Sequence, residues 1–255
     1  MIDLHCHFLP GIDDGPENLQ EALELAHAAV ADGITHSVLT SHVYPGRFPN
    51  QGQNLQVAIA DFKAQLLQAG IALKVSLGCE AHLSHELLDL IDTNEVPFLG
   101  EVDGYRILLL EFPPQIIPVG SIRFVNALLQ QKIRPLIAHP ERNKVVMIDT
   151  EKIRPFTEAG CWLQLTAGSL AGRFGIPAQQ TAFKLIDAGW NCVAATDAHN
   201  MRYRPPLLSE GRDALRARYG DAVAKAMVHD KPVAILGGQH DRSICLLQRQ
   251  DIAWH

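Results

Sequence analysis

Seven short β-type segments alternate with helix-type segments, and this alternation is the strongest constraint on how the chain can fold. Some of these segments, such as 107–110 and 136–138, are continuously apolar, as parallel strands buried on both faces are. The strict alternation favours an incomplete seven-unit (β/α) barrel of the α/β class over a flavodoxin-like open sheet. The predicted strands are 2–5, 35–40, 72–78, 105–110, 134–138, 161–166 and 191–195, and the predicted helices are 19–32, 55–68, 84–91, 121–131, 151–158 and 177–187.

The length of the chain suits one barrel domain or two small domains. It has 255 residues, of which 47% are hydrophobic. Because no linker or low-complexity segment divides it, we expect a single domain over residues 1–255. Residues 240–255 do not fit the alternation and are expected to form a loosely packed tail.

Charge and composition exclude several classes of protein. A net charge of -6 argues against a nucleic-acid binder, which usually carries a basic face. No stretch approaches the roughly 18 apolar residues that span a membrane, and the N-terminus lacks the basic region of a signal peptide. An odd count of 5 cysteines without framework spacing indicates reduced thiols. We therefore expect a cytoplasmic protein without membrane insertion.

Residue types that bind metals follow almost every predicted strand. Functional groups of (β/α) barrels gather where strands end, so these side chains are expected to converge. One such residue alone is more often a hydrogen-bonded structural group. A converging set, however, would be costly to bury without a cation, and this predicts a metal centre. The candidates at strand ends are His5, His7, His42, Glu80, Glu111, His139, Asp197 and His199, and the pair Asp13 and Asp14 in the first βα loop adds another candidate.

This set is larger than one ion requires. A tetrahedral site takes about four ligands, so a cluster of two or three ions bridged by a carboxylate is the economical explanation. Mixed nitrogen and oxygen ligands suit Mn²⁺, Fe²⁺ or Zn²⁺. Cys6 is excluded because its side chain should point to the opposite face of the strand from His5 and His7. His82 is also left out, although it lies close to Glu80 in the sequence.

Several segments carry a resemblance to a known family. They are the opening 1–7 and 11–16, which includes Asp13-Asp14-Gly15-Pro16, followed by 40–42, 78–80, 110–112, 137–142, 196–200 and 204–206. In order and spacing they resemble the bacterial capsule-type protein-tyrosine phosphatases of the polymerase and histidinol phosphatase (PHP) superfamily, up to about residue 237. The resemblance implies a distorted (β/α)7 TIM-like barrel of PHP type. It also implies a three-metal centre that uses manganese, with Fe²⁺, Zn²⁺ or Mg²⁺ as alternatives.

The resemblance also implies a role for each site residue. His5, His7, Glu80 and Asp197 would hold one ion, and Glu80 would bridge to a second ion held by Glu111 and His139. Asp14, His42 and His199 would hold the third. Two arginines of the family correspond to Arg142 and Arg204, which would bind phosphate as catalytic residues. The chain departs from some relatives at 43–47, where they carry a basic stretch, and this loop is expected to line the entrance.

The predicted activity is hydrolysis of phosphotyrosine by attack of a metal-bridging hydroxide on phosphorus. A cysteine-dependent mechanism is excluded, because no cysteine is followed six residues later by arginine. The implied substrate is the tyrosine-rich tail of a membrane-bound kinase of polysaccharide export, while the oligomeric state stays open. Alternatives are a small-molecule phosphatase acting on a compound such as histidinol phosphate, a metal-dependent nuclease and a non-enzymatic regulator. The acidic charge disfavours the nuclease, and the complete ligand set disfavours the regulator.

Overall fold

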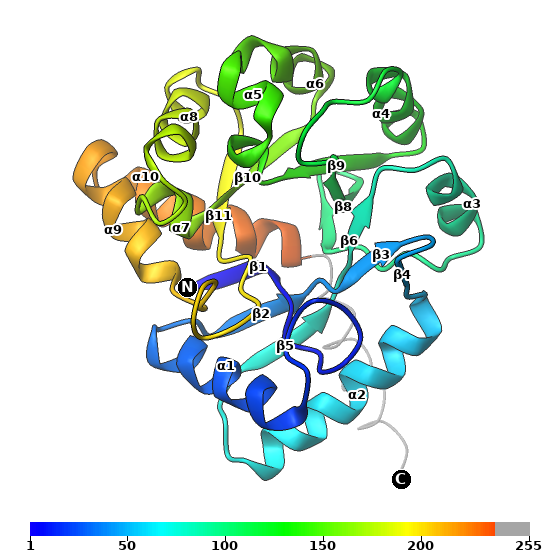
Figure 1. Ribbon diagram of the computed structural model, residues 1–255, viewed down its shortest axis with the longest axis vertical. Helices are drawn as coiled ribbons and strands as arrows, with labels where there is room; N and C mark the ends of the chain where they lie inside the picture. The colour runs from blue at the N-terminus through cyan, green and yellow to red at the C-terminus, as the bar shows by residue number, and fades with distance from the viewer. Residues whose placement is uncertain (238–255) are drawn as a thin grey trace, which may run out of the picture.

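The computed structural model describes residues 1–237. The predicted tail at 240–255 therefore lies outside the described residues. Figure 1 shows the strands at the centre of the molecule and the helices around them. The strands are β1 (Ile2–Cys6), β2 (His36–Leu39), β3 (His42–Tyr44), β4 (Phe48–Pro49), β5 (Lys74–Leu77), β6 (Glu80–His82), β7 (Gly100–Val102), β8 (Tyr105–Glu111), β9 (Ile133–Ala138), β10 (Trp162–Thr166) and β11 (Cys192–Ala195).

Each predicted strand and helix has a counterpart in the structure. The segment predicted as helix at 151–158 is divided between a short 3₁₀ helix and an α-helix. The helices are α1 (Leu19–Ala31), α2 (Gly52–Gln68), α3 (Glu86–Asp92), α4 (Ser121–Gln130), α5 (Lys144–Ile148), α6 (Arg154–Ala159), α7 (Ala167–Leu170), α8 (Ile176–Asp187), α9 (Leu208–Tyr219) and α10 (Asp221–Lys225), with 3₁₀ turns η1 (Pro140–Arg142) and η2 (Thr150–Ile153) and a π-helical turn η3 (Ala226–Asp230). No helix in the range 1–237 is long and apolar enough to cross a membrane.

The strands form two sheets, so the mixed α/β class is confirmed, but a single closed sheet is not seen in the described residues. One sheet has the parallel order β1-β2-β5. The other has the order β11-β10-β9-β8-β6-β3-β4, with β4 antiparallel to β3 and β7 antiparallel to β8. Only two residues separate β2 from β3 and β5 from β6, so the chain passes from one sheet to the other at two neighbouring places.

The two sheets meet again beside β1. Cys6 forms an isolated parallel bridge with Ala198, just beyond β11. The backbone N–H of His7 donates to Ala198 O at 2.9 Å, and the N–H of Asp197 donates to His5 O at 2.8 Å. Strand β1 and the segment after β11 are therefore held side by side, so the first and the last of the alternating βα units lie next to each other.

Strand β1 contains an irregularity that separates its side chains between two cores. Its register with β2 shifts between Asp3 and Cys6, as at a β-bulge, which re-aims side chains. Leu4 packs in a cluster of strand residues that also includes Ile235 and Leu236. Cys6 packs instead in the larger cluster that contains the buried faces of α1 and α2. His5 and His7 are fully buried, but they belong to neither apolar cluster. Their side chains belong to the candidate site described below.

Candidate metal centre

Four fully buried side chains meet near the end of β1, at the start of β6 and just beyond β11. His5 Nε2 lies 3.2 Å from Glu80 Oε2, 3.1 Å from Asp197 Oδ1 and 3.2 Å from His7 Nε2. One donor atom from each of these four residues lies within 4.8 Å of the others. This group has the same members as the set predicted for the first ion.

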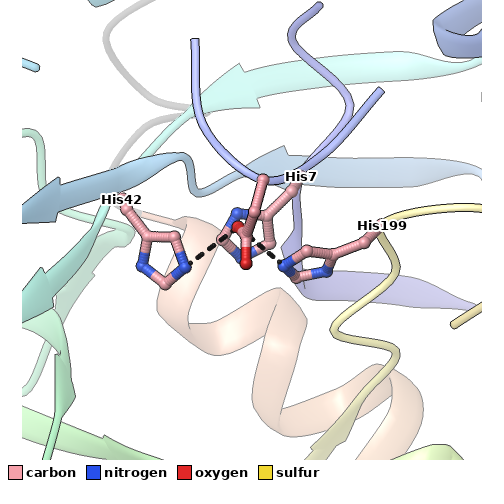
Figure 2. A group of neighbouring side chains, drawn as sticks. His7, His42 and His199 are labelled. Carbon is pink, nitrogen blue, oxygen red and sulfur yellow. Dashed lines mark ion pairs between the residues drawn. The ribbon is translucent and has the colours of Figure 1, made fainter. Parts of the chain in front are cut away.

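A second group surrounds Asp14, which projects from the loop after β1. Asp14 Oδ1 lies 3.2 Å from His42 Nε2 and 3.3 Å from His199 Nε2. In Figure 2, His42 and His199 flank His7, and dashed lines mark these two ion pairs. The group comprises the three residues predicted for the third ion together with His7, which belongs to both groups.

The third group differs in one member from the predicted set. Its members are His42, Glu80 and Glu111, with His42 Nδ1 3.3 Å from Glu80 Oε2 and 3.9 Å from Glu111 Oε2. His139 is not in the group, but its Nε2 lies 2.9 Å from Glu80 Oε1 and 3.9 Å from Glu111 Oε1. Glu80 therefore contacts imidazoles through both oxygens, as a bridging carboxylate must.

Asp13 shapes the loop after β1 through contacts with Gly15, His7 and His42. Its Oδ1 accepts the N–H of Gly15 at 3.0 Å, and its Oδ2 accepts the N–H of His42 at 3.0 Å. Oδ2 also lies 2.8 Å from His7 Nδ1, which leaves Nε2 of that ring free to face the cluster. A Cβ at Gly15 would lie 2.5 Å from His7 O, so this close turn requires glycine.

Gln164 on β10 supplies a support that the sequence did not reveal. Its Oε1 lies 2.8 Å from His5 Nδ1 and accepts the backbone N–H of His139 at 3.2 Å. The available signal was a lone amide between Leu163 and Leu165 in strand β10. Two site residues, His139 and Asp197, also adopt positive φ values of 32° and 54°, a conformation that non-glycine residues rarely adopt outside functional sites.

The two predicted arginines both reach the site and meet on Asp197. A guanidinium N–H of Arg142 and another of Arg204 donate to Asp197 Oδ2, each at 2.6 Å. The guanidinium of Arg142 also lies 4.9 Å from the ring centroid of Phe174. Both arginines line a cavity of about 240 Å³ together with Asp14, His42, Glu80, Glu111 and His139.

The charges of the cluster depend strongly on one another. Burial lowers the pKa of His7, but the carboxylates of Asp13 and Glu80 raise it to about 9. Burial raises the pKa of the Asp197 carboxyl, whereas Arg204, Arg142 and His5 hold it well below its usual value. These directions favour a protonated His7 ring and an ionised Asp197 carboxylate at neutral pH. Metal binding would require His7 to release its proton.

The donor set fits divalent cations. His42 Nδ1, Asp197 Oδ1 and His199 Nε2 are buried and make no hydrogen bond among the described residues. Each of the three lies 3.1–3.3 Å from another donor atom of the site, so a cation shared with that neighbour would satisfy both atoms. Burial, reinforced by His7, lowers the pKa of His199 to about 4, which keeps this imidazole in the neutral form that binds metals.

An α/β fold with clustered imidazole and carboxylate donors at its strand ends defines a metal-binding protein of the (β/α) type. The family model for capsular polysaccharide synthesis proteins of the CpsB/CapC type matches residues 1–237. The chain belongs to this family, and the predicted resemblance is confirmed. The putative tyrosine-protein phosphatase CapC of Staphylococcus aureus is 30% identical over 210 residues, which cover 82% of this chain and 81% of that protein.

Other relatives and solved structures agree. The tyrosine-protein phosphatase YwqE of Bacillus subtilis is 30% identical over 220 residues, 86% of this chain and 85% of that protein. One matching solved chain comes from the crystal structures of YwqE of Bacillus subtilis and CpsB of Streptococcus pneumoniae, which are described as unique metal-dependent tyrosine phosphatases. It matches with a TM-score of 0.87 and 28% identity, over 93% of this chain and 95% of that chain. An organophosphorus hydrolase of Deinococcus radiodurans, with a TM-score of 0.57 and 14% identity over 92% of this chain and 91% of that chain, shares the fold alone.

Proposed function

We propose that this protein is a metal-dependent protein-tyrosine phosphatase. The observation that carries the proposal is the single cavity that joins the donor groups to two guanidinium groups. Divalent ions held by these donors would neutralise phosphate charge and lower the pKa of a coordinated water. The nine proposed ligands are His5, His7, Asp14, His42, Glu80, Glu111, His139, Asp197 and His199, and the ion is proposed to be Mn²⁺.

Arg142 and Arg204 are proposed to bind the phosphate oxygens and to stabilise the charge that develops on them. Planar guanidinium groups suit this role because they present paired N–H donors. Arg204 Nε is buried and makes no hydrogen bond within residues 1–237, so this N–H remains available to an anion. Because both arginines also donate to Asp197, they hold this carboxylate in place while they bind phosphate. A phenolate leaves readily, so the mechanism does not depend on a strong general acid.

The family context extends the proposal to a substrate and a place of action. The description of the family as capsular polysaccharide synthesis proteins supports a substrate in that process. We propose the phosphotyrosine-containing tail of a membrane-bound kinase, dephosphorylated in the cytoplasm. We also propose that the two sheets together represent a distorted (β/α)7 barrel of PHP type within one domain, which the joining of β1 to the segment after β11 supports.

An assay panel tests the reaction class. Phosphotyrosine peptide, histidinol phosphate and single-stranded DNA are each incubated with the Mn²⁺-loaded protein, and turnover is measured. We expect hydrolysis of the phosphotyrosine peptide, its loss on chelation and its return when Mn²⁺ is added. Turnover confined to histidinol phosphate or DNA, or activity that survives complete metal removal, would contradict the proposal.

The substitution His5→Ala tests the metal centre. His5 contacts two carboxylates of the first donor group, so its loss should lower bound metal and reduce kcat/KM for phosphotyrosine peptide by more than about 100-fold, a larger effect than outer contacts produce. Metal content and kinetics are measured together, and circular dichroism reports the fold. The matched control is His27→Ala, because His27 is exposed on α1. Equal metal content in the two variants would exclude His5 as a ligand.

A further inference from the structure

The hairpin of β3 and β4 forms one wall of the catalytic cavity. Its two strands pair Tyr44 with Phe48, and both rings line the cavity. Figure 1 shows this hairpin beyond the end of β2, beside β6. It contains residues 43–47, the loop that is expected from the sequence to line the entrance.

Each ring of the hairpin lies parallel to a histidine of the site. Tyr44 stacks on His82, with 3.8 Å between ring centroids and an interplanar angle of 10°. Phe48 stacks on His42, at 5.3 Å and 8°. The guanidinium of Arg47 lies 4.9 Å from the centroid of Phe48. The two aromatic rings are therefore fixed by neighbours and do not depend on substrate for their orientation.

The cavity has two chemically different parts. The donor groups and the two arginines supply charge for a phosphoryl group. Tyr44, Phe48, Pro113 and Pro114 supply apolar lining in the same cavity. A phosphate ion or a phosphorylated alkyl alcohol would use only the charged part. A phenyl ring bonded to the phosphoryl oxygen would also cover the apolar lining, where ring contacts are favourable.

We propose that Tyr44 and Phe48 form an aryl subsite, which makes this cavity select phosphorylated phenols over phosphorylated alkyl alcohols. The proposal rests on the phosphatase function proposed above and adds the residues that set its specificity. Half-buried rings that are already ordered lose little freedom when a substrate ring packs against them, so the contact contributes to affinity.

The test compares two stable ligands that share a phosphonate but differ in the ring. Phenylphosphonate and methylphosphonate are titrated calorimetrically into the Mn²⁺-loaded protein, so binding is read without turnover. In Phe48→Ala, we expect the Kd of phenylphosphonate to rise roughly three- to tenfold, the size of an aromatic contact, while the Kd of methylphosphonate stays unchanged. Phe48→Leu, which keeps apolar bulk, is the second variant if the alanine variant does not fold, and it should give a smaller rise.

The control and the contrary outcomes separate this proposal from the proposed function. Tyr105→Ala removes an aromatic ring that also lies beside a guanidinium, that of Arg134, but at the start of β8 away from Glu111. It should leave both Kd values unchanged. If the Kd values of both ligands rise equally in the Phe48 variants, this ring only supports His42. If neither Kd changes, the ring does not touch the ligand. Either result would overturn the aryl subsite. A protein that shows the ring preference but hydrolyses no phosphotyrosine would refute the phosphatase function alone.

Discussion

His82 contacts a proposed metal ligand without belonging to any donor group. Its Nδ1 lies 3.2 Å from Glu111 Oε2, so a ring protonated at this nitrogen donates to the carboxylate. The ring of His82 also stacks on the ring of Tyr44. We therefore expect His82 to act as a positioning residue for Glu111. Supports of this kind orient a ligand and raise its affinity for the ion.

The substitution His82→Phe keeps a ring beside Tyr44 and removes the hydrogen bond to Glu111. We expect the Mn²⁺ concentration for half-maximal activity to rise about 10- to 100-fold, with a smaller change in kcat at saturating metal. Metal titration of phosphotyrosine hydrolysis measures both. His85→Phe is the control, because the side chain of His85 is 93% exposed. Identical activation curves for the His82 variant and the wild type would show that the contact is incidental.

Single residues also show how far the site could be predicted. The nine proposed ligands lie at or just after the ends of predicted strands or in the first βα loop, and the structure brings all of them to one cluster. In the structure itself, His42 and Glu80 are the first residues of the short strands β3 and β6. Gln164 and the role of Asp13 behind His7 could not be predicted, since both depend on side-chain contacts between distant segments. The third group contains His42 in place of the predicted His139. This difference depends on small differences in the distances between donor atoms, which the spacing of residues along the chain does not encode.

At the scale of elements, the long strands were predictable and the short ones were not. Strands β3, β6 and β7 have 3 residues each, and β4 has 2, which is too few for an alternating or continuously apolar pattern. The predicted strands 35–40 and 72–78 end at the breaks after β2 and β5, but the sequence does not show that the chain then enters the second sheet. These breaks place His42 and Glu80 on strands of the second sheet, in register with each other.

The junction between β1 and the segment after β11 depends on a buried hydrogen-bonded pair. Asp3 is fully buried and accepts both the backbone N–H and the hydroxyl of Thr196. Thr196→Val removes the hydroxyl and leaves one carboxylate oxygen without this donor, which should lower the free energy of unfolding by about 1–3 kcal/mol. Thr196→Ser retains the hydroxyl and should stay close to the wild type. Denaturant unfolding of the metal-free proteins compares the three, and equal losses in both variants would assign the effect to packing.

At the scale of the whole molecule, the donor groups draw on most of the chain. The first group joins β1, β6 and the segment after β11, and the second joins the loops after β1 and β11 to β3. Ions bound there would connect both sheets at their shared edge. The energetic cost of assembling buried carboxylates and imidazoles would then be offset only in the metal-loaded fold, so folding stability and metal binding should be linked.

This linkage predicts a metal-dependent melting temperature. At an ion concentration about 100 times Kd, binding to the native state alone adds about 2.7 kcal/mol, which for a chain of this size raises Tm by roughly 5–10 °C. Differential scanning fluorimetry with Mn²⁺ and with chelator measures the shift. Since His5→Ala removes a shared contact of the first group, its shift should be much smaller, whereas His27→Ala should keep the full shift. A Tm that is the same with Mn²⁺ and with chelator would contradict the linkage, because a fold that binds ions at sites drawn from both sheets cannot unfold without releasing them.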